Sequence, residues 1–138
     1  MSAWFTCLML QKLNSYDKQG NAGVGKAISY FTAKGYAISI PLTDTQKYDL
    51  LVDIEDRIYR VQVKTSYHQN SAGYYQVALR TTGSRKEAMR KPLDFDPKTC
   101  DYIFVLVEDG NTWLIPTTNL KNTNSLSLGK KYTKYKLG

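Results

Sequence analysis

Residues 48–65 read YDLLVDIEDRIYRVQVKT, and this stretch decides the fold class. Apolar side chains alternate with polar ones at Leu50, Val52 and Ile54, and they alternate again in residues 58–65. A period of two is typical of β-strands that bury one face. Because a short polar segment separates the two runs, the stretch predicts an antiparallel hairpin.

The polar segment 55–57 is expected to form the turn of this hairpin. Counted about a three-residue turn, Leu50 lies opposite Gln62, and Asp49 falls beside the segment from Gln62 to Lys64. Side chains two residues apart on a strand share one face of the sheet. The hairpin therefore brings a carboxylate, an amide oxygen and an ammonium group to one place.

This mixture of groups suits the hydrolysis of phosphodiester bonds. A hard divalent cation takes oxygen ligands, for which Asp49 and the Gln62 amide are candidates. Such a cation lowers the pKa of bound water, and the Lys64 ammonium would stabilise charge in the transition state. The alternative is a solvated strand face, where Asp, Gln and Lys are commonplace, and the spacing alone favours that alternative.

The rest of the chain predicts one α/β (α+β) domain over residues 1–138, with an N-terminal extension (1–17) and a basic C-terminal tail (122–138). The tail is expected to be loosely held. We expect a helical segment at 3–16, a helix of about 12 residues between the glycines at 20–25 and Gly35, strands at 37–42, 48–54, 58–65, 74–81, 101–107 and 112–115, and a short helix at 116–118.

The charge of the chain points to a polyanionic partner. The formal net charge is +7 and the pI is near 9.4, and a basic surface speeds encounter with nucleic acid. Residues 57–91 hold eight basic residues and one acidic residue. The candidate contacts to phosphates and base edges are Gln69, Asn70, Arg80, Arg85, Lys86, Arg90, Lys91, Lys130 and Lys131. The alternative for this patch is a surface that only keeps the protein in solution.

Several classes of protein are disfavoured. Cys7 and Cys100 fit no zinc motif, and His68 is the only histidine, so we expect two reduced thiols in a cytoplasmic protein. The apolar stretch 3–10 lacks the features of a signal peptide, and no apolar run approaches the roughly 18 residues of a membrane span. A lone histidine is more often a surface residue than a catalytic one.

Residues 20–65, GNAGVGKAISYFTAKGYAISIPLTDTQKYDLLVDIEDRIYRVQVKT, resemble the PD-(D/E)XK endonucleases associated with group I introns. The shared features are a glycine-rich helix start, a helix ending at KGY, a PL turn, YD in place of PD, and a strand ending RVQVKT. The later segment DYIFVLV…WLIP also looks like that family's core. The resemblance covers about 100 residues, and archaeal Holliday-junction resolvases have a similar but more distant layout.

The resemblance implies a restriction-endonuclease-like core, in which helices flank a central mixed sheet. It also implies cleavage of double-stranded DNA that depends on Mg²⁺, or on Mn²⁺, including site-specific cleavage of the homing type. By this resemblance Asp49, the Gln62 amide and the backbone carbonyl of Val63 bind the metal, and Lys64 is the catalytic cation. Gln62 would stand for the usual acidic residue, a known kind of variant in this family.

The chain departs from the family pattern at Val24, where the resemblance places a glutamate after the glycines. No acidic residue lies between Asp17 and Asp44. The chain is then a degenerate relative, or it carries an inactivating substitution, or Asp44, Asp53 or a substrate phosphate supplies the missing oxygen. Fewer anionic ligands weaken cation binding.

Cleavage of both strands needs two sites, which a symmetric homodimer or homotetramer supplies. The apolar residues Trp4, Phe5, Leu8 and Leu10 are candidate contacts between subunits. Three other functions stay open: a catalytically impaired DNA-binding module on the same fold, a nuclease like the Holliday-junction resolvases, and a small RNA-binding protein that needs only the charge.

Overall fold

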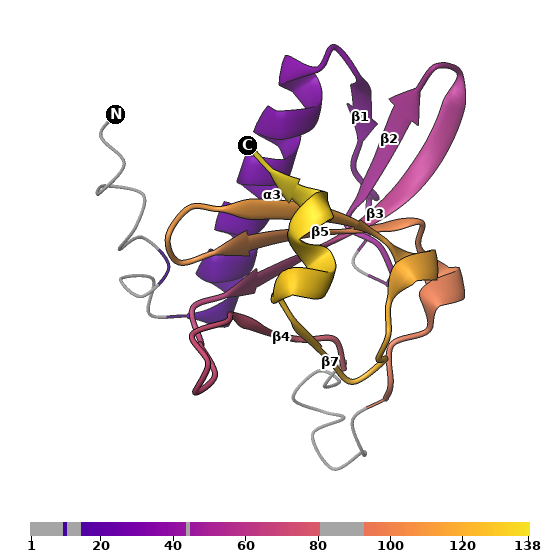
Figure 1. The fold of residues 1–138 in the computed structure, drawn as a ribbon. Helices are drawn as coiled ribbons and strands as arrows, with labels where there is room; N and C mark the ends of the chain where they lie inside the picture. Colours follow the sequence, from indigo (N-terminus) through magenta and orange to yellow (C-terminus); the bar gives the residue numbers. More distant parts are fainter. Residues whose placement is uncertain (1–9, 11–14, 44, 81–92) are drawn as a thin grey trace.

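A six-stranded sheet forms the centre of the molecule, and one long helix lies across one of its faces (Figure 1). The computed structural model describes residue 10 and residues 15–43, 45–80 and 93–138. Its elements are α3 (Tyr16–Ala33), β1 (Ala37–Ser39), β2 (Leu50–Ile54), β3 (Arg57–Ser66), β4 (Gln76–Ala78), the 3₁₀ helix η2 (Pro97–Thr99), β5 (Tyr102–Val107), β6 (Thr112–Pro116), η3 (Thr117–Asn119), β7 (Ser125–Ser127), η4 (Lys130–Tyr135) and β8 (Lys136–Leu137).

The sheet is mixed, as expected. Its strand order is β1-β2-β3-β5-β6-β8, in which β3 and β5 run parallel and the other neighbours run antiparallel. The strand β5 is central and almost wholly buried, which confirms the prediction from its continuous apolar sequence. The strand β4 does not join this sheet, because it pairs with β7 in a separate two-stranded sheet.

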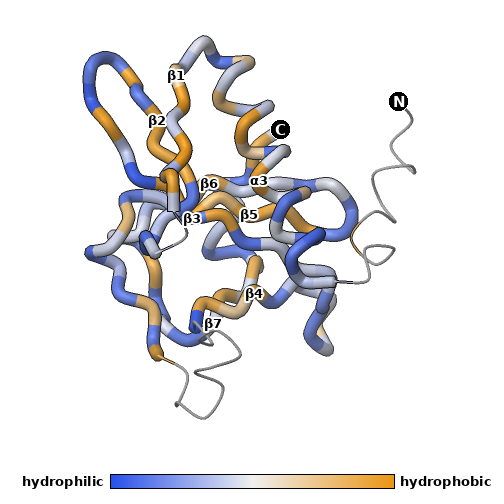
Figure 2. The backbone as a smooth tube through the Cα atoms, turned by 180° about the vertical axis from the view of Figure 1, so that it is seen from behind, coloured by the Kyte–Doolittle hydropathy of each residue, from blue (hydrophilic) through white to orange (hydrophobic). Residues whose placement is uncertain are grey.

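Two hydrophobic cores lie on opposite faces of the six-stranded sheet. The helix-side core consists of Ala27, Phe31, Leu50, Val52, Val61 and Phe104. The far-side core consists of Val77, Leu79, Phe95, Cys100, Ile103, Val105, Val107, Trp113, Ile115, Leu126, Leu128 and Tyr132. Apolar segments follow the strands, whereas the β2–β3 hairpin ends in a hydrophilic tip (Figure 2). In the described residues, no helix is long and apolar enough to cross a membrane.

The helix α3 is longer than the predicted 12 residues, because it starts before the glycines. It spans 18 residues, and Ser15 caps it by accepting a hydrogen bond from the Lys18 N–H at 3.2 Å. A glycine inside a helix costs roughly 1 kcal/mol. Gly23 is nevertheless required, since a Cβ there would lie 2.6 Å from Thr65 Cγ2 and 3.0 Å from Val63 Cγ1. The helix thus approaches β3 closely.

The hairpin turn has two residues, so the three-residue turn and its register were wrong by one position. Glu55 and Asp56 have φ angles of 51° and 65°, and two left-handed residues match the twist of the flanking strands. Leu50 therefore lies opposite Val61, and not opposite Gln62. This register pairs buried apolar residues with each other.

The C-terminal segment is part of the core, so the prediction of a loosely held tail from residue 122 is wrong. Leu126, Leu128 and Tyr132 are buried in the far-side core, and β8 extends the main sheet. The strand β1 is shorter than expected and ends before Pro41, which cannot donate a ladder hydrogen bond. The proposed subunit contacts Trp4, Phe5 and Leu8 lie outside the described residues, and Leu10 is buried.

We predict opposite effects on stability for two substitutions in α3. Gly23→Ala should lower the free energy of unfolding by about 1–3 kcal/mol, because the new methyl group meets Val63 and Thr65. Gly25→Ala should raise it by up to about 1 kcal/mol, because nothing lies within 4 Å of its Cβ position. Urea denaturation followed by circular dichroism measures both, and equal effects would contradict the close packing of α3 on β3.

Candidate active site

Asp49 is fixed to β3 at two points, one on each side of Gln62. Its backbone N–H donates to the Val61 carbonyl at 2.9 Å, and its Oδ2 accepts a hydrogen bond from the Val63 N–H at 2.7 Å. The carboxylate thereby satisfies the Val63 N–H, which would otherwise need a backbone acceptor. The strand β2 begins at the next residue, Leu50. The structure therefore places Asp49 beside Gln62, as the sequence predicted.

The Gln62 side chain carries a buried oxygen that has no hydrogen-bond partner among the described residues. Its Oε1 accepts no hydrogen bond from any residue in the described part of the chain. Burial of an unpaired acceptor costs about 1–3 kcal/mol, and most buried polar atoms avoid that cost. An oxygen left in this state beside a carboxylate is suited to a ligand with positive charge.

The backbone of Val63 faces the same edge of β3 as Asp49. The N–H of Val63 points to the Asp49 carboxylate, and the N–H and C=O of one strand residue point to the same side. The Val63 carbonyl is thus directed toward the end of the hairpin where Asp49 lies. Three oxygens, from Asp49, Gln62 and Val63, belong to this one region.

Asp49 and Lys64 interact electrostatically in a partly dehydrated environment. Burial raises the pKa of Asp49, whereas the Val63 hydrogen bond and the Lys64 charge lower it. Burial lowers the pKa of Lys64, whereas the charge of Asp49 raises it. Burial thus favours the neutral form of both groups, and a positive ligand near Asp49 would favour its ionised form.

On its other edge, β3 is held by Asp101, a residue not identified in the sequence analysis. Asp101 Oδ2 accepts from the Arg60 N–H at 2.8 Å, and the Asp101 N–H donates to the Arg60 carbonyl at 2.8 Å. The signal was present, because Asp101 precedes a buried strand just as Asp49 does. Cys100 is buried beside it, and burial raises the pKa of this thiol to about 11, so it is neutral at pH 7.

The position of the missing glutamate lies against β3. Val24 is half-buried and packs on the helix-side core, and the adjacent Gly23 faces Val63 and Thr65. In the described residues, no group of three His, Cys, Asp or Glu side chains could hold a metal ion. Val24 is thus an apolar side chain at the position where the resemblance led us to expect a glutamate.

Asp53 and Asp44 were the two residues of the chain considered as alternative oxygen donors for the metal. Asp53 is exposed near the outer end of the hairpin, opposite Ile58 and about 13 Å along the strand from Asp49. Asp53 is therefore too far away to complete the site. Asp44 lies outside the described residues.

Two of the predicted DNA contacts have partners within the protein. Arg80 forms an ion pair with Asp94 at 2.8 Å and also donates to the Asn124 side chain at 3.2 Å. Asn70 Oδ1 accepts from the backbone N–H groups of Ala72 and Tyr74 at 3.0 Å each. The Asn70 side chain therefore builds its own turn.

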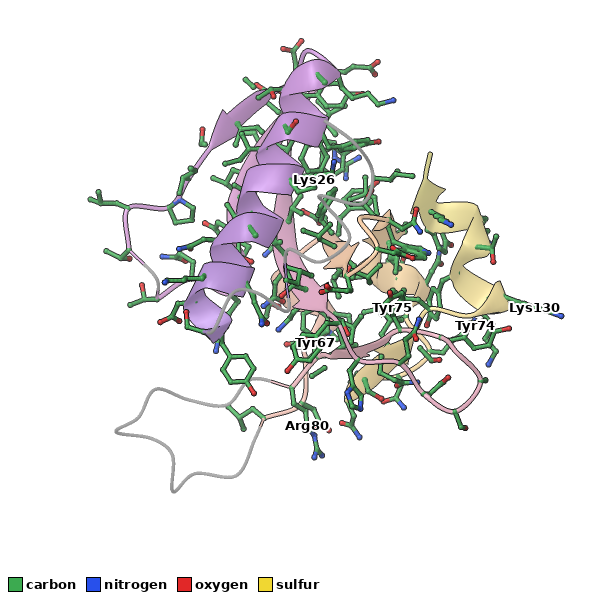
Figure 3. All side chains as sticks on the ribbon, turned by 90° about the vertical axis from the view of Figure 1, so that its left-hand side faces the viewer. Lys26, Tyr67, Tyr74, Tyr75, Arg80 and Lys130 are labelled. Atoms are coloured by element: carbon green, nitrogen blue, oxygen red, sulfur yellow. The ribbon has the colours of Figure 1, made fainter. Side chains whose placement is uncertain are left out.

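The other predicted contacts are exposed or lie outside the described residues. Gln69 is exposed, and so are His68 and the lysines 130 and 131 at the start of η4. Lys130 lies far from the helix residue Lys26 in Figure 3. The contacts outside the described residues are Arg85, Lys86, Arg90 and Lys91.

Comparison with known proteins places this geometry in a family. A family model described as PD-(D/E)XK endonuclease matches residues 14–133. Among solved structures, the chain is similar to I-Ssp6803I, a bacterial homing endonuclease, with 26% identity and a TM-score of 0.69 over 85% of this chain and 80% of that one. This similarity confirms the restriction-endonuclease-like architecture. No curated protein matches the chain significantly.

Proposed function

Because the chain belongs to the PD-(D/E)XK endonuclease family, we propose that it hydrolyses phosphodiester bonds of double-stranded DNA in a metal-dependent reaction. The observation that carries this proposal is the buried, unpartnered Oε1 of Gln62 beside Asp49 and Lys64. Since a homing endonuclease is similar in structure, we extend the proposal to site-specific cleavage of the homing type.

The residues at the site fit a divalent cation with a preference for oxygen. Asp49, the Gln62 amide oxygen and the Val63 carbonyl would hold Mg²⁺, with Mn²⁺ as an alternative. The unpartnered oxygen of Gln62 supports this assignment, because a cation would satisfy it. A bound cation lowers the pKa of its water and neutralises charge on the scissile phosphate.

The protein residues around the phosphate have distinct tasks. The hydrogen bond from Val63 orients the Asp49 carboxylate, and partial burial strengthens the electrostatic interactions of the site. The Lys64 ammonium would contact the scissile phosphate and stabilise the negative charge that develops in the transition state. Its lowered pKa also makes loss of its proton easier than for an exposed lysine.

A second function, an impaired DNA-binding module on the same fold, is favoured by one observation. Val24 replaces the expected glutamate and packs in an apolar environment, so the site has one carboxylate among the described residues. A weaker cation site would lower activity without affecting the fold. In this second function the protein would still bind DNA but would cleave it slowly or not at all.

We predict that purified protein cleaves duplex DNA with Mg²⁺ or Mn²⁺ and not with EDTA. Asp49→Asn and Lys64→Met should each lower the cleavage rate by at least about 100-fold, because they remove a metal ligand and the phosphate-binding cation. Asp53→Asn is the matched control, since it removes the same charge from the exposed end of the same strand. Gel assays measure the rates, and a parent-like rate for Asp49→Asn would refute the assignment.

We predict that Val24→Glu raises the cleavage rate by about tenfold or more, by adding the carboxylate that the family places there. Val24→Gln has a similar shape without the charge and should not raise the rate. Activity that appears only in Val24→Glu would mean that the parent chain is the impaired module. Equal rates for both variants would mean that position 24 does not serve the metal site.

We further propose that the active form is a homodimer or homotetramer, since one site cuts one strand and symmetry supplies the second. Light scattering after size exclusion, with and without duplex DNA and Ca²⁺, should give a mass of two or four times 15.7 kDa plus any bound DNA. A single monomer mass in both conditions would contradict this proposal.

A further inference from the structure

A pocket of about 590 Å³ lies between η4 and the β7 region, and three lysines line it. We call it the lysine pocket and define it by Lys121, Lys130 and Lys131, together with Tyr74, Gly129 and Tyr132. Tyr74 and Lys130 lie side by side in Figure 3, on the side of the molecule away from α3. Lys121 is nine positions from Lys130 and ten from Lys131, so only the folded chain brings it to this pair.

The backbone around the lysine pocket is held in place by the core. Tyr132 is buried, and its hydroxyl oxygen accepts a hydrogen bond from the Lys121 N–H at 3.2 Å. The Tyr132 N–H donates to the Gly129 carbonyl at 3.1 Å, which starts η4. The Tyr74 ring closes another wall, since a Cβ on Gly129 would lie 3.4 Å from it. The three lysines therefore extend from a fixed frame.

The charge in this pocket is uncompensated. No Asp or Glu lines it, and in the described part of the chain no ion pair involves Lys121, Lys130 or Lys131. The neighbouring Lys134 and Lys136 differ, because their ammonium groups lie over the rings of Tyr135 and Trp113. Like charges held together without a counter-charge favour the binding of an anion.

Residues of the lysine pocket and of the candidate active site belong to the same side of the sheet. Gln62 and Lys64 lie opposite Ile103 and Val105 in the β3–β5 register, so these side chains share one face. Ile103 and Val105 belong to the far-side core, and so does Tyr132 of the pocket. We therefore expect a duplex bound at the active site to lie on the same side of the sheet as the lysine pocket.

We infer that the lysine pocket binds a backbone phosphate of the DNA, outside the phosphodiester that is cleaved. This inference rests on the proposed function, and it adds a contact that positions the duplex. A phosphate held by ammonium groups contributes affinity without reading sequence, and each such contact adds to the salt dependence of binding. The pocket would thus serve any sequence of DNA equally.

The test compares two double variants that lose the same charge from the same segment. Lys130→Gln/Lys131→Gln removes two pocket lysines, whereas Lys134→Gln/Lys136→Gln removes the two that lie over rings. Fluorescence anisotropy with a labelled duplex and Ca²⁺, at several KCl concentrations, gives the Kd and its salt slope. The pocket variant should bind about tenfold more weakly, with a slope smaller by about 1, and the control should keep the slope of the parent.

The other outcomes separate the pocket from the proposed function. Equal slopes for the two variants would overturn the pocket, because net charge alone would then explain the loss. If inorganic phosphate raises the melting temperature of the parent only, while both variants bind DNA alike, the pocket is a small-anion site and the inference fails. If the parent binds no duplex at all, the proposed function fails with it. Unchanged melting temperatures of both variants establish that they fold.

Discussion

The hydrogen bond from the Val63 N–H to the Asp49 carboxylate joins the fold to the chemistry of this endonuclease family member. It ends the β2–β3 ladder with a side chain in place of a backbone carbonyl, and it leaves the rest of that carboxylate beside Gln62. Asp101 holds the opposite edge of β3 in the same manner, through Arg60. The strand that carries Gln62 and Lys64 is thus positioned from both sides.

Burial disfavours the polar groups of the site. Partial burial shifts the pKa of Asp49 upward and that of Lys64 downward, so both charged forms are disfavoured. The Gln62 oxygen is buried with no hydrogen-bond partner in the part of the chain that the structure describes. Stability comes instead from the two cores, and from the close approach of α3 that Gly23 allows. A preorganised group of polar atoms, held in place before the ligand arrives, is what binding of a charged ligand requires.

Patterns of short range were sufficient for the hairpin and the central strand. Alternation at Leu50 and Val52, and the continuous apolar run of β5, depend only on neighbouring residues. The turn length was wrong because it depends on left-handed φ angles at both Glu55 and Asp56, and such angles are uncommon in residues other than glycine. The tail was misjudged because its few apolar residues, such as Tyr132, are spaced among polar ones and gain burial only from distant partners.

The sequence by itself determined that Gln62 and Lys64 share one face of a strand and that Asp49 lies near them in the hairpin. The register that sets Asp49 opposite Gln62 came only from the folded structure. The sequence also determined that Val24 stands where a carboxylate is expected. Only the tertiary structure decided that the Gln62 oxygen finds no partner among the described residues and that Lys121 joins Lys130 and Lys131 in one pocket. Periodicity is a local property of the chain, whereas burial, hydrogen-bond pairing and clustered charge depend on residues that are far apart in sequence.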